Sequence, residues 1–301
     1  MSTASTHFAG TLSFRRSWRA RLLPVALMAP TALFAMAVTL VPLAYLVRTS
    51  VQEYRLGQSP TFVGLQNYRH FLIDESFRAS LLTTLVFTVA ATGVEFVLGL
   101  ALALLLKEEF SFQGLIRSSL IVPMVIAPVV VGIIWRLLYG ADVGLFSFAV
   151  NALTGRTVNV LSNPRLALPA LILVDVWEWT PFMFLLLLAG IQSLPQEPFE
   201  AARVDGAGPW NVFLHLTMPM LRPVIVVAIL IRALDAFTVF DQVFVLTQGG
   251  PGTATEVATL MIYKSAFRFS QFGYAAAMAI ALLVLITFFS AAVTRAFRGN
   301  G

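Results

Sequence analysis

The chain has 301 residues, of which 58% are hydrophobic and only 12% charged, with a formal net charge of +5. Soluble domains carry about 25% charged residues, so this composition argues against a soluble protein and favours one that spans a lipid bilayer. The sequence contains no cysteine, which excludes disulfides, a thiolate nucleophile and a cysteine-bound metal.

Arginines gather ahead of the first apolar stretch, at Arg15, Arg16, Arg19 and Arg21. Basic residues next to a membrane span favour the cytoplasmic side, where the leaflet is anionic. We therefore interpret the positive charge as a membrane-orientation signal and expect no nucleic-acid partner. Residues 1–22 are expected to form a cytoplasmic tail.

Uncharged stretches predict an all-α membrane protein with about six transmembrane helices, because about 20 apolar residues span the hydrocarbon core. An even number of spans places both termini on one side, here the cytoplasm. The expected spans are 23–47, 79–106, 117–138, 166–192, 222–246 and 273–295, together one domain over 23–295, followed by a cytoplasmic tail at 296–301.

The residues needed for nucleotide or metal binding are missing from the sequence. Neither lysine, Lys107 or Lys264, follows a glycine, so no P-loop is present. The histidines His7, His70 and His215 are scattered and fit no HExxH spacing. We expect no cofactor and no metal on this chain.

The segment 193–221 is a polar inside loop between the fourth and fifth spans. Pro195 and Pro198 end one helix and suit the first turn of another. Gly206 and Gly208 should break that second helix before a further helical stretch, 210–218. The pattern predicts two short helices lying across the inner membrane surface; from spacing alone, an interfacial hairpin without a partner remains an alternative.

Seven residues of this loop follow the pattern EAA-x-x-D-G-A…P, namely Glu200, Ala201, Ala202, Asp205, Gly206, Ala207 and Pro219. The pattern resembles the cytoplasmic signature of permease subunits from binding-protein-dependent ABC importers. Two further patches are similar to permeases of the maltose and trehalose type, 95–103 and 234–252.

The resemblance implies the type I ABC importer permease fold, and it implies that Glu200, Ala201, Ala202, Asp205, Gly206 and Ala207 form a coupling helix that docks on an ATPase subunit. It also implies a second homologous permease, two ATP-binding cassette ATPases that hold the ATP and Mg, an extracytoplasmic solute-binding protein and a location in the bacterial inner membrane. Trehalose or maltose is the favoured solute class, with a polyol or glycerol phosphate as alternatives.

Polar residues inside the predicted spans need a partner or a wet cavity, because a charge at mid-membrane costs about 2.5–3.5 kcal/mol on insertion scales. A path for an uncharged polyhydroxyl solute is one interpretation, since carboxylates and amides bond hydroxyls and aromatic faces stack on sugars. The candidate lining residues are Asp175, Trp177, Glu178, Asp235, Phe237, Asp241 and Gln242.

A structural interpretation of the same residues is also open. Arg232 and Asp235 are three apart on one helix face and can form an ion pair, and Glu95 can hydrogen-bond a neighbouring helix. Gln242, seven residues beyond Asp235, is expected to return to the same face.

Two other classes of protein compete with the importer permease. A secondary solute transporter would be expected to contain inverted repeats or paired broken helices, and neither is visible in the sequence. An intramembrane enzyme could use Asp175 and Glu178 as an acid–base pair, but no nucleophile–base motif accompanies them. We therefore expect a non-catalytic subunit.

Overall fold

The computed structural model describes residues 18–108, 111–140, 144–155 and 159–298. It separates into two units, residues 1–48 and residues 49–301. The first unit holds most of helix α1, Trp18–Ser50, whose apolar stretch Ala26–Ser50 is long enough to cross a membrane. The second unit holds the elements that form the candidate site.

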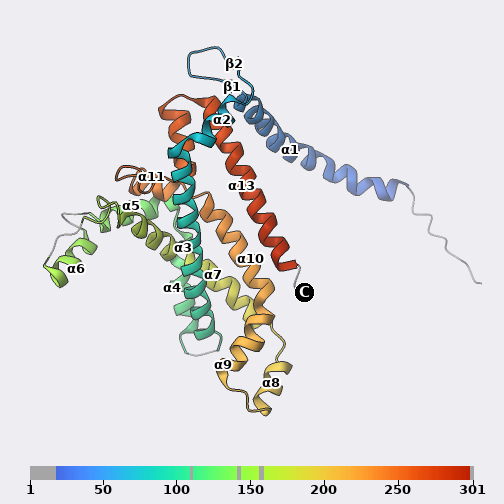
Figure 1. The fold of residues 1–301 in the computed structure, drawn as a ribbon. Helices are drawn as coiled ribbons and strands as arrows, with labels where there is room; N and C mark the ends of the chain where they lie inside the picture. Colours follow the sequence, from blue (N-terminus) through green and yellow to red (C-terminus); the bar gives the residue numbers. More distant parts are fainter. Residues whose placement is uncertain (1–17, 109–110, 141–143, 156–158, 299–301) are drawn as a thin grey trace, which may run out of the picture. The chain divides into compact units, whose positions relative to one another are not determined.

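The second unit is almost entirely helical in its described part (Figure 1). A two-stranded antiparallel hairpin, β1 (Gln52–Glu53) and β2 (Thr61–Phe62), precedes its helices. The helices are α2 (Gln66–Ile73), α3 (Glu75–Leu105), α4 (Gln113–Val125), α5 (Pro128–Leu138), α6 (Leu145–Thr154), α7 (Ala167–Gln192), α8 (Glu197–Val204), α9 (Pro209–Val212), α10 (Met218–Phe237), α11 (Asp241–Leu246), α12 (Ala258–Tyr263) and α13 (Phe272–Arg298), with π-helical turns η1 (Phe213–Thr217) and η2 (Lys264–Arg268).

The prediction of about six spans is confirmed by the length and apolar character of the helices. Among the described residues, five helical segments are long and apolar enough to cross a membrane, and a sixth is available if the bent pair α4–α5 counts as one. In the second unit, four single segments meet this criterion: α3, α7, Pro209–Leu246 and α13.

Two predicted spans are not continuous helices. The span predicted at 117–138 is bent by 96° between α4 and α5, where Pro123 and Pro128 remove backbone donors and restrict the preceding residues. The span predicted at 222–246 is interrupted at 238–240, between the end of α10 and the start of α11.

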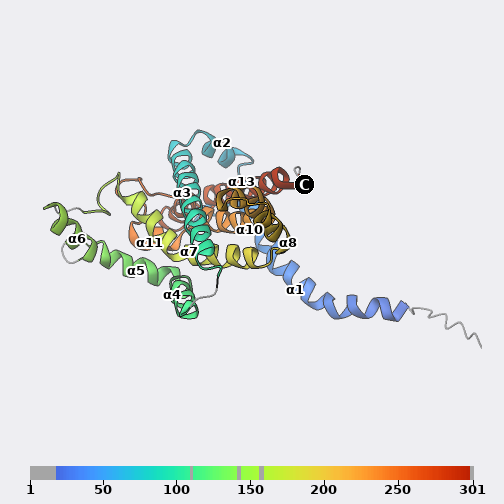
Figure 2. The same ribbon diagram turned by 90° about the horizontal axis from the view of Figure 1, so that it is seen from below.

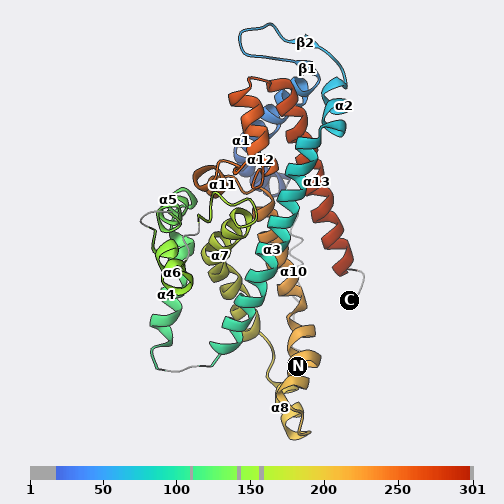
Figure 3. The same cartoon turned by 60° about the vertical axis from the view of Figure 1, so that its left-hand side comes forward.

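Helices α3, α7 and α10 form the centre of the second unit (Figure 3). Small residues allow close approach: a Cβ on Gly99 of α3 would lie 2.9 Å from the Met183 side chain and from the backbone nitrogen of Phe184 on α7. Viewed from below, α5 and α6 lie on one side of this centre and α13 on the other (Figure 2).

The start of α3 is fixed by one carboxylate. Asp74 caps the helix by accepting hydrogen bonds from the backbone nitrogens of Ser76 at 2.9 Å and Phe77 at 3.3 Å. Its second oxygen accepts the hydroxyl of Tyr274 at 2.5 Å, which ties the first turn of α13 to the same point. The hairpin, α2 and these helix starts lie at one end of the unit, and α8 and α9 lie at the other (Figures 1 and 3).

Candidate functional site

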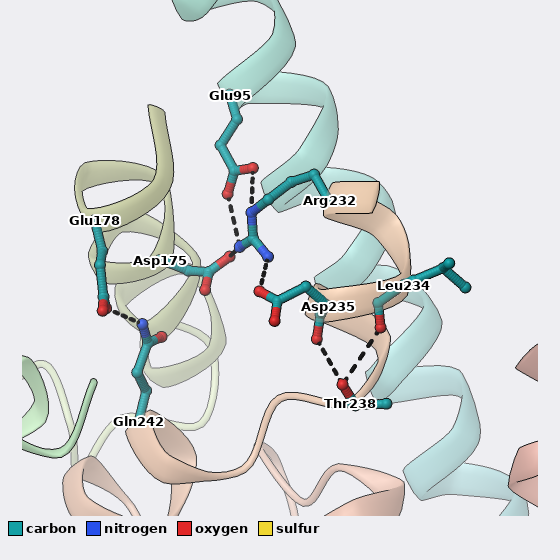
Figure 4. A network of polar contacts seen from close by, with 8 residues as sticks. All are labelled: Glu95, Asp175, Glu178, Arg232, Leu234, Asp235, Thr238 and Gln242. Carbon is teal, nitrogen blue, oxygen red and sulfur yellow. Dashed lines mark hydrogen bonds and ion pairs between the residues drawn. The ribbon is translucent and has the colours of Figure 1, made fainter. Parts of the chain in front are cut away.

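A single arginine joins the three central helices. Arg232 of α10 approaches Glu95 of α3, with 2.7 Å between Arg232 Nε and Glu95 Oε2 and 3.0 Å between Nη2 and Oε1. The same guanidinium forms ion pairs with Asp175 of α7 and, at 2.6 Å, with Asp235 one turn along α10 (Figure 4). Arg232, Glu95, Asp175 and Asp235 are called the arginine cluster below.

Burial makes the pairing in the arginine cluster necessary. The side chains of Arg232, Glu95 and Asp175 are at most 2% exposed, whereas that of Asp235 is 54% exposed. An unpaired charge in such a place is strongly unfavourable, and the planar guanidinium fork suits several carboxylate partners at once. The ring of Trp179 adds a cation–π contact, with its centroid 5.0 Å from the Arg232 carbon Cζ.

A second buried contact lies beside the arginine cluster. Gln242 donates a hydrogen bond of 2.5 Å to Glu178, and both side chains are almost completely buried. Because Glu178 lies on α7 and Gln242 on α11, this bond attaches the short helix after the break to the central bundle (Figure 4).

A cavity of about 130 Å³ with mixed polar and apolar walls opens at the break after α10. It is lined by Pro128, Asp175, Trp179, Asp235, Ala236, Thr238, Val239, Phe240, Asp241 and Gln242. Carboxylates, a hydroxyl and an amide can bond a solute's hydroxyl groups, and the aromatic rings offer apolar faces. This set of residues is called the central cavity below.

The central cavity brings together most of the polar residues singled out from the sequence. Four of them line it, namely Asp175, Asp235, Asp241 and Gln242, and Glu178 accepts a hydrogen bond from Gln242. The expected Arg232–Asp235 pair is present, but it belongs to a larger cluster. Gln242 does not continue the face of Asp235, because the helix is broken between them.

Two aromatic candidates lie elsewhere. Trp177 lines a separate apolar crevice between α3, α4 and α7, and its ring meets that of Trp135 edge to face with centroids 5.6 Å apart. Phe237 is buried in an apolar cluster with Met261 and Met278. Neither residue lines the central cavity.

Sequence reasoning missed several members of this site. Glu95 was expected to bond a neighbouring helix, but its ion pair with Arg232 was not foreseen. Thr238 and Phe240 reach the central cavity from the helix break, and Trp179 reaches it from α7. One signal was available in the sequence. Glu95 lies in the middle of a span with no basic residue near it in sequence, which indicates that its partner lies on another helix.

The segment with the permease signature forms the exposed helix α8. Pro198 lies in its first turn, the helix ends at Val204, and Gly206 follows its C-cap with a φ of +73°, which suits glycine. Ala207 N donates to Ala202 O at 2.9 Å and Gly206 N donates to Arg203 O at 3.2 Å, which is the Schellman arrangement of a helix end.

The prediction of a separate second surface helix is wrong in one respect. The stretch predicted at 210–218 is α9 followed by η1, and it runs directly into α10. The ring of Trp210 stacks on that of Phe213, with centroids 5.4 Å apart. Segment α8 is therefore joined through one turn to the helix that carries Arg232.

A family model described as "Binding-protein-dependent transport system inner membrane component" matches residues 95–298. The chain is 38% identical over 99% of its length to the probable ABC transporter permease y4oQ of Sinorhizobium fredii, of which the match covers 98%. It is 38% identical over 76% of its length to the trehalose/maltose permease MalF of Thermococcus litoralis, covering 77% of that protein, and 36% identical over 86% to the trehalose permease SugA of Mycobacterium tuberculosis, covering 83%.

The fold has solved counterparts. A bacterial ABC transporter structure described as importing the acidic polysaccharide alginate contains a chain with TM-score 0.82 and 21% identity, covering 94% of this chain and 97% of that one. An amino acid ABC transporter gives TM-score 0.52 at 18% identity, covering 80% of this chain and 99% of that one. From the family match and the near full-length relatives, this chain belongs to the permease family of binding-protein-dependent ABC transporters.

Proposed function

We propose that the chain is one of two permease subunits of an ATP-driven sugar importer, with a solute of the trehalose or maltose class. Support for the solute class comes from relatives at 36–38% identity that are named for these sugars. The wall of the central cavity places hydrogen-bonding groups beside aromatic rings, a combination that suits hydroxyl-rich solutes. In this proposal the protein lies in the cell membrane with both termini in the cytoplasm.

The proposed partners are a second permease, two ATPase subunits and an extracytoplasmic binding protein. ATP and Mg are held by the ATPases, and this chain binds no cofactor. The observation that carries the proposal is α8, a helix bearing the Glu200–Ala202 signature that none of the described residues of this chain buries. Val204 of α8 is 88% exposed and Trp210 of α9 is 69% exposed, which suits a surface covered by a partner.

The coupling mechanism follows from the connection between α8 and α10. Closure of the ATPases on ATP would displace α8, and the displacement would pass through α9 and η1 into α10. Because α10 carries both Arg232 and Asp235, the motion reaches the arginine cluster and the wall of the central cavity. Energy thus enters by movement of packed helices, and the chain itself performs no chemistry.

Co-purification tests the proposed coupling surface. The tagged chain is co-expressed with the transporter genes of its genomic neighbourhood, and Val204→Asp in α8 is compared with Phe62→Asp in β2. Both residues are highly exposed, at 88% and 78%, so neither change buries a charge within the chain. We expect an ATPase to co-purify with the wild type and Phe62→Asp but not with Val204→Asp.

Equal recovery of the ATPase with both variants would show that α8 is not the docking surface. Failure to recover any ATPase with the wild type would remove the proposed partnership itself.

A further inference from the structure

The wall of the central cavity carries acidic charge and no basic residue. Asp175, Asp235 and Asp241 contribute carboxylates, and none of its lining residues is Lys, Arg or His. Arg232 lies next to it but is already engaged by Glu95 and by two of these aspartates. Among the described residues, Asp241 forms no ion pair, and its side chain is exposed.

The site carries net negative charge whatever the protonation of its buried carboxyls. If Glu95, Asp175 and Glu178, which are at most 2% exposed, all held protons, Arg232 would still only offset Asp235. The exposed carboxylate of Asp241 would remain uncompensated. With any of the buried carboxyls ionised, the site is more negative still.

A side-chain amide at the central cavity lacks one hydrogen-bond donor. Gln242 is 2% exposed and lines the cavity, its nitrogen is used by Glu178, and its oxygen Oε1 has no hydrogen-bond partner among the described residues. A buried amide oxygen without a partner is unfavourable, and a solute hydroxyl or ammonium group would satisfy it.

We propose that the central cavity selects by charge: it accepts neutral or cationic polyhydroxyl solutes and rejects phosphorylated, sulfonated or carboxylated ones. Asp241 and Asp235 are the specificity-determining residues, and Gln242 supplies the acceptor for a solute hydroxyl. The inference deepens the proposed function, on which it rests for the assumption that solute crosses this cavity. The repulsion acts because carboxylates of one sign line a confined cavity, whose low-dielectric walls focus their field on an entering solute.

The cysteine-free sequence allows a direct test of the charge in the cavity. Thr238 lines the cavity and is exposed, so Thr238→Cys in the full chain, in membranes with its co-expressed partners, provides one reactive thiol in this subunit. Its rate of modification is measured by mass spectrometry with a cationic methanethiosulfonate, the ethyltrimethylammonium reagent, and with the anionic ethylsulfonate reagent. Ser59→Cys, on the exposed hairpin loop, gives the reference ratio.

We expect the cationic-to-anionic rate ratio at Thr238→Cys to exceed that at Ser59→Cys, and to fall on the order of fivefold when Asp241→Asn is added. Neutralisation lowers one rate and raises the other, so the ratio responds to both. Asp241→Asn breaks no ion pair among the described residues, and Val239→Cys serves as a second reporter if Thr238→Cys does not assemble.

Equal ratios at the cavity and the hairpin, no response to Asp241→Asn, or no reaction at either reporter would each overturn the proposal. The outcome is separate from that of the proposed function. Labelling can reveal an electronegative cavity in a chain that binds no ATPase, and a chain that couples to an ATPase can have a cavity without charge preference.

Discussion

Arg232 and Glu95 lie 137 positions apart in the sequence, yet Arg232 Nε and Glu95 Oε2 are 2.7 Å apart and both side chains are buried. This pair connects α10, the helix continuous with the signature segment, to α3. Through Asp175 the same arginine also reaches α7. The arginine cluster is therefore the point at which the three central helices are held by charge as well as by apolar packing.

Removing Arg232 should strongly destabilise the bundle. Arg232→Ala leaves Glu95 and Asp175 buried without a cation, and breaking a buried pair in this way typically costs about 3–5 kcal/mol. We expect a large drop in the thermal midpoint of the detergent-solubilised protein. The matched control is Asp235→Asn, which removes a carboxylate that is 54% exposed and should cost about 1 kcal/mol or less. Equal midpoints for the two variants would contradict the assignment of Arg232 as the shared partner.

The bond between Glu178 and Gln242 should show the asymmetry of a buried polar pair. Gln242→Leu leaves the Glu178 carboxyl without its donor and should destabilise the protein by about 1–3 kcal/mol. The double variant Glu178→Met, Gln242→Leu removes both partners and should be more stable than Gln242→Leu alone. Thermal midpoints of the two variants check this, and a double variant that is less stable than the single one would argue against the contact.

Gly99 should be needed for the approach of α3 to α7. Gly99→Ala places a Cβ 2.9 Å from Met183 and from the backbone of Phe184, and overpacking of this kind costs about 1–3 kcal/mol. Gly93 lies on the same helix with nothing within 4 Å of an added Cβ, so Gly93→Ala should be neutral or slightly stabilising. The folded fraction after heating measures both, and a Gly99→Ala protein as stable as Gly93→Ala would refute the close packing.

Gly206 should hold the end of the signature helix. Its φ of +73° disfavours any residue with a Cβ by about 1–2 kcal/mol, so Gly206→Ala should fray α8. Amide exchange of a peptide covering 197–207 should accelerate by about fivefold or more, read by mass spectrometry. Gly208, with φ of −66°, provides the control, since Gly208→Ala needs no strained backbone. An unchanged exchange rate in Gly206→Ala would mean that the turn does not stabilise the helix.

Hydropathy alone was enough to predict the all-α membrane fold and the approximate spans. An apolar run predicts that a helix crosses a membrane, but it does not predict where the helix bends. A proline alone does not locate the bend, because membrane helices tolerate proline wherever neighbouring groups satisfy the freed backbone carbonyls. The bend near Pro128 and the break at 238–240 were therefore missed. The break matters most, since it creates the central cavity and turns Gln242 toward Glu178.

The candidate site was partly predictable for a similar reason. Ionisable residues inside a membrane span are energetically unfavourable and therefore rare, so Asp175, Arg232 and Asp235 could be chosen from the sequence. Helical spacing reveals only partners on the same helix, such as Arg232 and Asp235. The pairing with Glu95 depends on how helices pack in three dimensions, which no local pattern records.

Coupled ATPase activity tests the central claim most directly. The chain is reconstituted in proteoliposomes with its genomic partners and binding protein, and ATP hydrolysis is measured with and without a trehalose-class sugar. The account predicts hydrolysis that rises when sugar and binding protein are both present and that loses this response in Val204→Asp. Sugar uptake driven by an ion gradient, without an ATPase and unaffected by Val204→Asp, would contradict it and indicate a secondary transporter.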